Sequence, residues 1–459
     1  MKSIDRQSKF QELRDKYPWF VYQSYTFRFK NGMLQLKFNF NLADKYLFEP
    51  ELEIPARHFY DWEAIPIPQL ENLIFHIGMI ELISYWKCSC APKIIVKPFN
   101  LTAEQITFWK KLYFHGLGEF FYLNGLNPSQ HDFVTINSDS ERELEMLDRQ
   151  LDAKVLVPVG GGKDSVVSLE LLRTTHKVIP FIINPRPASI RCAAVAGFEA
   201  QQTAVVNRKL DPLLLQLNEE GFLNGHTPFS ALLAFVSLLT AAGAGLRYIA
   251  LSNESSANEP TVPGTEINHQ YSKSIDFERD FSAYVGRYIH RELSYFSFLR
   301  PLNELQIAQL FSRFEAYHPV FRSCNAGSKT DSWCGKCSKC LFTWIILSPF
   351  IKHQKLLQLF GKNLLEDAAL HPILDELSGR SVIKPFECVG TLDEVNAALG
   401  DLKIKSPFDD MPLLLKKYQI TDRAISSEKS ALEEQLTAWQ ETHFLPESFS
   451  ELLNRALYD

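Results

Sequence analysis

The sequence has no excess of basic residues. Lys and Arg number 48 against 54 Asp and Glu, so the formal net charge is −6 at neutral pH. Proteins that bind nucleic acid through its phosphate backbone usually carry a basic patch or stripe. We therefore expect a small-molecule substrate and no nucleic-acid partner.

The sequence also has few long apolar stretches. Its first 20 residues are polar and mixed in charge, so we expect no secretory signal. The longest apolar run, residues 229–246, is diluted by serine, threonine and glycine and is followed by Arg247. We expect this run to be a buried helix and not a membrane span. The protein is accordingly expected to be cytoplasmic, with no membrane partner.

Cysteine is scarce, with eight residues in 459, which argues against a disulfide-based scaffold. Four of the eight nevertheless cluster, the last three at Cys-x2-Cys-x2-Cys spacing: Cys324, Cys334, Cys337 and Cys340. Four thiolates in such a pattern suit a closed tetrahedral zinc site. A ferredoxin-type run would need a further Cys followed by Pro, where this chain has Trp344. We expect structural zinc; an iron–sulfur cluster and unligated thiols are the alternatives.

The strongest motif is a glycine-rich turn between a predicted strand and a predicted helix. Residues 154–159 favour a buried strand, and the apolar periodicity from Val166 onward indicates a helix. Glycines let the backbone approach a ligand closely, and a helix N-terminus presents N–H groups and a positive dipole end. The predicted phosphate-binding loop consists of Gly160, Gly161, Gly162, Lys163, Asp164 and Ser165. An ordinary glycine turn is the alternative.

The loop does not fit the two commonest phosphate-binding patterns. Walker A requires Lys followed by Ser or Thr, whereas Asp164 follows Lys163 here. The dinucleotide-binding pattern fails as well, because Lys-Asp-Ser follows Gly162. The loop resembles the Ser-Gly-Gly-x-Asp-Ser motif of the PP-loop ATP pyrophosphatase superfamily, with Gly160 at the position of the first serine. That resemblance implies cleavage of ATP to AMP and pyrophosphate.

The same resemblance implies roles for side chains at the loop. Lys163 and the loop amides would stabilise the departing pyrophosphate. Asp164 would hold magnesium, the alternative being a carboxylate that only complements the helix dipole. Asn184 follows the second predicted strand, and ligands of parallel sheets bind beyond the carboxyl ends of strands. We therefore expect Asn184 to contact the nucleotide.

From residue 151 the chain alternates between predicted strands and helices. This alternation is typical of an α/β fold with a doubly wound parallel sheet, here of the PP-loop type. In the longest helix we expect Thr227 to be the cap and Pro228 the first residue. The predicted strands are residues 154–159, 178–184, 213–217 and 248–251, and the predicted helices include 199–209 and 229–246.

We predict three parts in the chain: an N-terminal α+β domain over 1–150, a PP-loop ATP pyrophosphatase domain with the four-cysteine site over 151–345, and a helical region over 346–459. In the first part, alternating aromatic runs flank Asn31-Gly32, which is a strong hairpin signal. The acidic residues 138–152 are expected to form a helix. No catalytic motif is recognised in the first or the third part.

Two families share these motifs. The loop followed by four cysteines resembles 7-cyano-7-deazaguanine synthase, but that resemblance covers at most residues 154–345. The whole chain more closely resembles the ATP-dependent epimerases of UDP-N-acetylmuramoyl-L-alanyl-L-glutamate. The segments that carry this resemblance are GGGKDS, GHTP, SNESSANEP, NHQYSKS and CGKCSKC.

The epimerase resemblance implies inversion of a terminal L-glutamate to D-glutamate on the nucleotide-linked dipeptide, in peptidoglycan precursor synthesis. It further implies an acyl-adenylate, release of AMP and pyrophosphate, and a requirement for magnesium. The alternative enzymes are a 7-cyano-7-deazaguanine synthase and a tRNA-modifying ATP pyrophosphatase, and the non-enzymatic alternative is a nucleotide-sensing protein. The sequence indicates no oligomeric state.

Inversion requires an acid and a base at the α-carbon. The candidates are Glu254, His226 and His269, because they lie in predicted loops near the carboxyl edge of the sheet. A structural role is the alternative for each histidine. Cys192 is a weaker candidate. Two arginines, Arg186 and Arg191, are candidates to grip a phosphate or carboxylate, with a solvated surface role as the alternative.

Overall fold

The computed structural model describes residues 6–262, 264–406, 411–418 and 428–458. The chain divides into two compact units, each built from segments that are far apart in sequence. Unit 1 contains Met1–Leu156, Ala204–Ile249 and Glu266–Tyr295, and unit 2 contains Val157–Thr203, Ala250–Thr265 and Phe296–Asp459. The chain passes between the units five times, and three of these passages fall within strands: β7 (Asp152–Pro158), β10 (Leu246–Leu251) and β11 (Ser294–Ser297). The division into residues 1–150, 151–345 and 346–459 remains a prediction.

The strands join a large mixed sheet, so the chain is an α/β protein as expected. The pair β7–β10 is parallel, as the strand–helix alternation predicted from residue 151 favours. The pairs β1–β5 and β5–β6 are also parallel, while β2 and its neighbours are antiparallel. That this sheet is of the PP-loop type remains a prediction. In unit 1 the hydrogen-bonded order is β6 (Thr135–Ser138), β5 (Lys93–Val96), β1 (Trp19–Lys30), β2 (Met33–Leu42), β4 (Glu51–Pro55) and β9 (Ala204–Lys209), with β3 (Tyr46–Phe48) also on β2.

The predicted hairpin near the start of unit 1 is confirmed. Strands β1 and β2 pair in antiparallel fashion up to Lys30 and Met33, which leaves Asn31 and Gly32 as a two-residue turn. Both turn residues have positive φ, 51° and 68°, as the hairpin turn of type I′ requires. Alternate residues of β2 are buried, so one face of the hairpin contributes to the core of unit 1.

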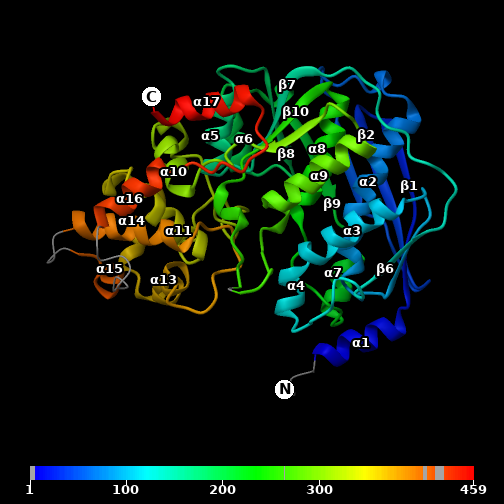
Figure 1. The fold of residues 1–459 in the computed structure, drawn as a ribbon, viewed down its shortest axis with the longest axis horizontal. Helices are drawn as coiled ribbons and strands as arrows, with labels where there is room; N and C mark the ends of the chain where they lie inside the picture. The colour runs from blue at the N-terminus through cyan, green and yellow to red at the C-terminus, as the bar shows by residue number, and fades with distance from the viewer. Residues whose placement is uncertain (1–5, 263, 407–410, 419–427, 459) are drawn as a thin grey trace. The chain divides into compact units, whose positions relative to one another are not determined.

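The core of unit 1 is completed by helices. Helix α2 (Ile67–Trp86) is buried over most of its length and packs against α8 (Phe229–Gly243), as Figure 1 shows. Helix α8 is the predicted buried helix, but it begins one residue later than expected, because Pro228 and not Thr227 occupies the capping position. The other helices of unit 1 are α1 (Arg6–Lys16), α3 (Ala103–Gly116), α4 (Gly118–Leu123), α7 (Pro212–Glu219) and α9 (Ile275–Tyr288).

Two neighbouring elements are the reverse of the prediction. The structure has a strand, β9, within the predicted helix 199–209, and a helix, α7, at the predicted strand 213–217. Strand β9 pairs with β4, a partner far away in sequence that no local pattern reveals. The Leu213 amide donates to the Asp211 side chain (2.9 Å), and Pro212 takes the first helical position, so a helix starts there.

The acidic residues 138–152 do not form the predicted helix. Their backbone is instead bound by other elements of unit 1: Leu147 N donates to the Ile289 carbonyl (2.8 Å), and Asp148 N donates to Gln69 Oε1 (2.9 Å). Because these tertiary hydrogen bonds satisfy the backbone groups, the segment needs no helical ladder.

Unit 2 holds a β–α core and the described C-terminal helices α10 to α17. Strand β8 (Val178–Ile183) lies in sequence between α5 (Lys163–Leu172) and α6 (Pro187–Val195). Just past β7, the Val159 amide donates to the Phe181 carbonyl of β8 (2.8 Å). In Figure 1, α10, α11, α14 and α16 lie together. The C-terminal helices are α10 (Glu304–Ser312), α11 (Ser338–Leu347), α12 (His353–Phe360), α13 (His371–Ser378), α14 (Leu392–Lys405), α15 (Leu413–Lys417), α16 (Glu428–Thr437) and α17 (Glu447–Tyr458).

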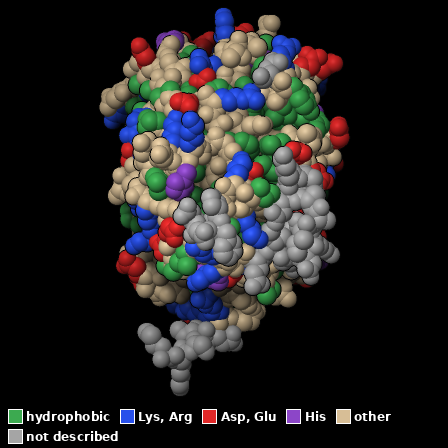
Figure 2. Space-filling view, turned by 90° about the vertical axis from the view of Figure 1, so that its left-hand side faces the viewer, with side chains coloured by type: hydrophobic (Ala, Val, Ile, Leu, Met, Phe, Trp, Pro, Cys, Tyr) green, Lys and Arg blue, Asp and Glu red, His purple; other side chains and the backbone are tan. Residues whose placement is uncertain are grey.

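Surface and helix composition bear on the expected partners. On the face shown in Figure 2, basic and acidic side chains are both scattered among uncharged ones. This mixture agrees with the small negative net charge. Among the described residues, no helix combines the length and the apolarity that crossing a bilayer requires.

Candidate active site

The predicted phosphate loop is a tight turn between β7 and α5. Gly161 has φ +89°, and a Cβ at this position would lie 2.7 Å from Ser189 N and 2.8 Å from Ala188 C. Any side chain there would therefore collide with the backbone at the start of α6. At Gly160, by contrast, a Cβ would meet nothing within 4 Å. The loop thus presents open backbone at a helix N-terminus, an arrangement that binds anions.

Contacts within unit 2 hold the loop in this shape. The Arg322 amide donates to the Gly161 carbonyl (2.8 Å), and the Ser165 hydroxyl donates to the Gly162 carbonyl (2.9 Å). The buried Ser165 therefore closes the turn. Cys192 Sγ lies 3.7 Å from the Gly161 carbonyl, and burial raises the pKa of this thiol to about 12. Cys192 is thus protonated at neutral pH, which does not favour it as a base.

Lys163 is the first residue of α5 and is only 3% exposed. Its ammonium group forms ion pairs with the carboxylates of Asp164 and Glu304. Burial disfavours the charged form, but the two carboxylates outweigh burial and raise the pKa of Lys163 above its ordinary value. Lys163 is therefore a cation held at the N-terminus of α5 by two acids.

Glu304 is a site residue that no motif in the sequence marks. Burial raises its pKa well above the ordinary value, and the negative charges of Asp164, Glu254 and Glu394 add to this, although Lys163 opposes them. The Glu304 amide donates to Glu394 Oε1 (2.6 Å), so α14 brings a carboxylate from the C-terminal helical region. We call Asp164, Glu254, Glu304 and Glu394 the acidic cluster. A sequence pattern could not have found it, because its members meet only in the fold.

Two predicted site residues of unit 2 each follow a strand. Asn184 comes directly after β8 and has φ +48°, a left-handed conformation that asparagine tolerates better than most residues. Glu254 follows β10 and is 4% exposed, and its Oε1 accepts a hydrogen bond from Ser256 Oγ (3.2 Å). Arg300 donates to the Glu254 carbonyl (2.6 Å), which anchors the segment. Glu254 is thereby held in the acidic cluster.

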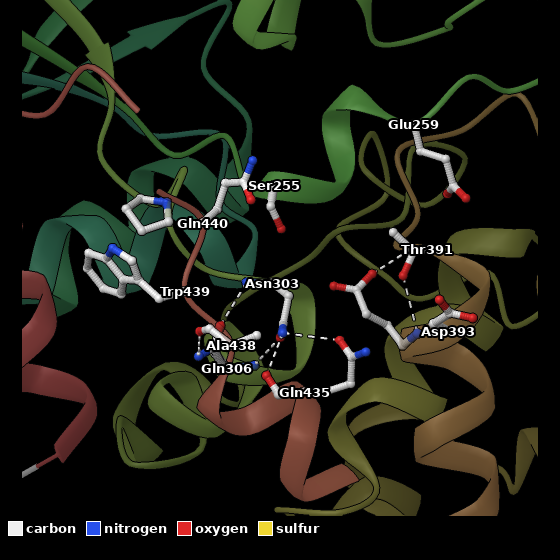
Figure 3. A pocket seen from close by; sticks show the side chains of 12 residues that line it. Ser255, Glu259, Asn303, Gln306, Thr391, Asp393, Gln435, Ala438, Trp439 and Gln440 are labelled. Atoms are coloured by element: carbon white, nitrogen blue, oxygen red, sulfur yellow. Dashed lines mark hydrogen bonds between the residues drawn. The ribbon is translucent and has the colours of Figure 1, made fainter. Parts of the chain in front are cut away.

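A cavity of about 340 Å³ reaches the acidic cluster at Glu394. Figure 3 shows its amide side chains, which come from the start of α10, from α16 and from the segment that follows α16. Asn303 Nδ2 donates to the Gln435 carbonyl (2.6 Å), and Gln306 Nε2 donates to the Ala438 carbonyl (2.7 Å). These bonds hold the end of α16 on α10. The described residues that line the cavity include amides, acids and a tryptophan but no Lys or Arg, so the cavity does not suit an anionic group.

The four clustered cysteines meet at the start of α11. Their Sγ atoms are 3.8 Å apart for Cys324–Cys337, 3.7 Å for Cys334–Cys340 and 3.6 Å for Cys337–Cys340. Four thiolates at about 2.3 Å from one tetrahedral ion would lie about 3.8 Å from each other. A disulfide would bring two sulfurs to about 2.05 Å, and a cluster of several iron and sulfide ions would need wider spacing. The cysteines therefore form a possible site for one metal ion.

The two histidine candidates lie together in unit 1, against Glu119 of α4. His269 Nδ1 forms a hydrogen bond with Glu119 Oε2, and His226 Nδ1 lies 3.5 Å from the same oxygen. The two ring centroids are 4.6 Å apart. Burial, followed by the neighbouring His269, lowers the pKa of His226 to about 4. Two histidines and a carboxylate could also hold a metal ion. No local pattern in the sequence marks Glu119.

The two arginine candidates differ in their surroundings. Arg191 of α6 forms an ion pair with Asp331, and Arg322 Nε donates to the Asp331 carbonyl (3.3 Å). Arg191 is therefore engaged within unit 2. Arg186, which directly precedes α6, is exposed.

Two family models match the chain. The model described as the MurL N-terminal domain matches residues 11–298, which is more than half of the chain. The model described as the MurL C-terminal domain matches residues 320–432. No solved structure matches the chain.

Three similar proteins are each named UDP-N-acetyl-alpha-D-muramoyl-L-alanyl-L-glutamate epimerase. The one from Xanthomonas oryzae pv. oryzae is 35% identical over 342 residues, which cover 73% of this chain and 75% of the relative. The one from Salinispora tropica is 33% identical over 421 residues, which cover 86% of this chain and 87% of the relative. The one from Micromonospora sp. is 35% identical over 405 residues, which cover 84% of this chain and 89% of the relative. On these matches the chain belongs to the MurL family of epimerases, and it is an isomerase.

Proposed function

We propose that the chain inverts the terminal L-glutamate of UDP-N-acetylmuramoyl-L-alanyl-L-glutamate to D-glutamate, with ATP cleaved to AMP and pyrophosphate. The ATP-dependent part is supported by the loop, which admits no side chain at Gly161 and places Lys163 at the N-terminus of α5. Backbone amides and a buried cation at one point suit nucleotide phosphates. The names of the relatives support the substrate and a role in peptidoglycan precursor synthesis. Family membership favours this reaction over a 7-cyano-7-deazaguanine synthase or a tRNA-modifying enzyme.

Such a loop has a clear purpose in this reaction. The α-proton of a free carboxylate is hard to remove, because the carbanion would lie beside an anion. Attack of the carboxylate on the α-phosphorus of ATP forms an acyl-adenylate and expels pyrophosphate, whose charge Lys163 and the loop amides stabilise. A base then removes the α-proton and an acid returns one to the other face. Water finally cleaves the acyl-adenylate and releases AMP.

We propose Asp164 as the residue that binds magnesium together with the nucleotide. Magnesium prefers oxygen ligands and is usually held by one or two carboxylates plus substrate phosphates. The Asp164 side chain is 33% exposed, whereas that of Glu304 is 5% exposed. Asp164 is therefore the member of the acidic cluster best able to meet a ligand from solvent. When bound, the ion would neutralise charge on the phosphates.

Glu254, His226 and His269 are proposed for proton transfer. The histidine ring centroids are 4.6 Å apart. Both Nδ1 atoms lie close to Glu119 Oε2, so we treat the two histidines as one group in unit 1. Glu254 belongs to unit 2 and is a separate candidate for the acid or the base.

The proposal is tested by a product assay in deuterated water, with the full substrate, ATP and magnesium. We expect one AMP and one pyrophosphate for each acyl-adenylate formed and cleaved, and D-glutamate that carries deuterium at the α-carbon. Labelling should be nearly complete, because separate acid and base groups equilibrate with solvent. The α-carbon should not exchange without ATP, since the free carboxylate leaves its proton too weakly acidic.

Other outcomes of this assay would contradict parts of the proposal. Release of ADP would contradict the assignment of the loop. Exchange at the α-carbon without ATP would exclude activation of the carboxylate as the purpose of the loop. Extensive return of the original proton to the α-carbon would indicate a single base. The matched control is the nucleotide-linked substrate that ends at L-alanine, which should yield no glutamate product.

The four cysteines are proposed to hold one structural zinc ion. A closed site of four thiolates has no open position for a substrate. We therefore expect about one zinc per chain by elemental analysis, and a lower unfolding temperature for Cys337→Ser with kcat of the folded fraction changed less than about threefold. Cys388→Ser lies outside the four and is the control that should retain zinc. Bound iron, or wild-type protein that contains no metal, would contradict the assignment.

A further inference from the structure

Glu119, His226 and His269 come from three segments that are far apart in sequence. Their side chains are 11%, 25% and 15% exposed, so the group lies below the surface of unit 1 without being sealed. Asn124, directly after α4, donates to the Asn224 carbonyl (3.1 Å) and so ties α4 to the segment that carries His226. The arrangement is therefore supported by contacts of the backbone around it.

The hydrogen bond to Glu119 decides which nitrogen of His269 is basic. A carboxylate only accepts hydrogen bonds, so the ring proton lies on Nδ1. The lone pair is then on Nε2. When Nε2 takes a proton, the ring becomes a cation that the Glu119 carboxylate stabilises, as in a carboxylate–histidine pair of a hydrolase. Glu119 therefore prepares His269 to act as a base.

His226 is not an equivalent partner. Its Nδ1 is 3.5 Å from Glu119 Oε2, at the outer limit for a hydrogen bond. Burial, together with the positive charges of His269, Lys87 and Lys273, lowers the pKa of His226 to about 4, although Glu119 opposes them. His226 is therefore neutral at pH 7 and cannot donate a proton as an imidazolium.

Unit 1 has a second cavity, whose lining includes sequence neighbours of Glu119 and His269. It measures about 350 Å³, and its lining includes Gly118 and Ile267, which stand one and two residues before Glu119 and His269. Most of its lining is aromatic or otherwise apolar, and the titratable groups in it are His115, Tyr122 and Glu266. Such a cavity gives a small molecule a place beside the two segments that carry the pair.

We propose that Glu119 is the positioning residue for His269, and that His269 so oriented is the base on one face of the α-carbon. This inference rests on the proposed function. In the step, the C–H bond breaks, its electron pair moves into the enolate of the acyl-adenylate, and an Nε2–H bond forms. Glu119 keeps its hydrogen bond with Nδ1 throughout, and His269 later loses the proton to solvent. No oxidant or reductant is needed.

Glu119→Gln tests the proposal, because an amide N–H in place of the carboxylate can donate to Nδ1 and move the ring proton to Nε2. We expect deuterium exchange at the α-carbon to fall by about 10²–10⁴-fold, the range of general acid–base assistance. Exchange of labelled pyrophosphate into ATP, which reports adenylation alone, should change less than about threefold. Glu119→Asp keeps a carboxylate, so its deuterium exchange at the α-carbon should be at least about tenfold faster than that of Glu119→Gln.

A second readout does not depend on ATP. The imidazole nitrogen shifts of His269, assigned by comparison with His269→Gln, should report the proton on Nδ1 in the wild type and on Nε2 in Glu119→Gln. The matched control is Glu104→Gln, which removes an exposed carboxylate that pairs with Arg287 and should change neither readout.

Several results would overturn the proposal. One is α-proton exchange at the wild-type rate in Glu119→Gln, and another is a wild-type His269 with its proton on Nε2. If Glu119→Gln and Glu119→Asp each lost α-proton exchange and pyrophosphate exchange to the same extent, the role of Glu119 would be merely structural. A metal ion bound in addition to the cysteine site and lost in Glu119→Gln would make the histidines ligands. Wild-type protein that exchanges no pyrophosphate would contradict the proposed function, while the nitrogen shifts would still decide the role of Glu119.

Discussion

Replacing Asp164 by Asn should lower AMP formation by about 10³-fold or more, the scale of losing a principal contact to a transferring phosphate group. The Asp164 carboxylate lies at the N-terminus of α5, is 33% exposed, and is the proposed magnesium ligand. The fold should survive the change, because Lys163 keeps its ion pair with Glu304. AMP release with the full substrate and the midpoint of urea unfolding measure the two effects.

The control for this variant is Asp152→Asn. Asp152 is an exposed residue of β7 that pairs with Lys154, so its loss removes one negative charge without touching the loop. It should leave AMP formation unchanged. Wild-type turnover in Asp164→Asn would contradict the role of Asp164. An unfolding midpoint that falls with the activity would mean that Asp164 is mainly structural.

Replacing Lys163 by Met should remove both activity and stability. The variant loses the cation proposed to stabilise pyrophosphate, and it leaves the buried Glu304 without its ion-pair partner. Removing one member of a buried pair costs about 3–5 kcal/mol of folding free energy. Without Lys163, burial and the remaining acids raise the pKa of Glu304 further above its unfolded value. Such a carboxyl favours folding below its unfolded pKa and loses that contribution as pH rises, so the destabilisation should be smallest in acid and should grow as the pH rises above the unfolded pKa of a glutamate.

The double variant Lys163→Met with Glu304→Gln separates the two effects. Because Gln at position 304 carries no charge, most of the lost stability should return and the pH dependence of stability should flatten. AMP formation should stay at the level of Lys163→Met, since the cation is still missing. Recovery of activity in the double variant would contradict the proposed role of Lys163. Unchanged stability in the single variant would mean that the ion pair is not maintained in solution.

Sequence reasoning reached the loop because its requirements are local. Gly161 needs positive φ and a close backbone approach, and Lys163 to Ser165 follow within one turn of α5. The hairpin at Asn31-Gly32 was accessible for the same reason, since two residues set the turn and alternation sets the burial. The cysteine cluster was found because metal sites use short, recognisable spacings.

Sequence reasoning failed where a distant partner decides the structure. Strand β9 exists because β4 pairs with it. Residues 139–151 stay irregular because Asn72 and other groups of unit 1 bind their backbone. Glu304, Glu394 and Glu119 carry no local signal at all. Each becomes a site residue through a contact made across the chain: Lys163 with Glu304, Glu304 with Glu394, and His269 with Glu119.

The sequence by itself therefore determined the α/β class, the strand–glycine–helix loop with its lysine and aspartate, and the set of four cysteines. It also placed the chain close to the epimerases to which it proved to be related. Only the tertiary structure decided which acids surround Lys163, and that His226 and His269 share one carboxylate with ring centroids 4.6 Å apart. The physical reason is that turns and spacings are properties of a few consecutive residues, whereas pKa values and proton-transfer geometry depend on charges and rings brought together by packing.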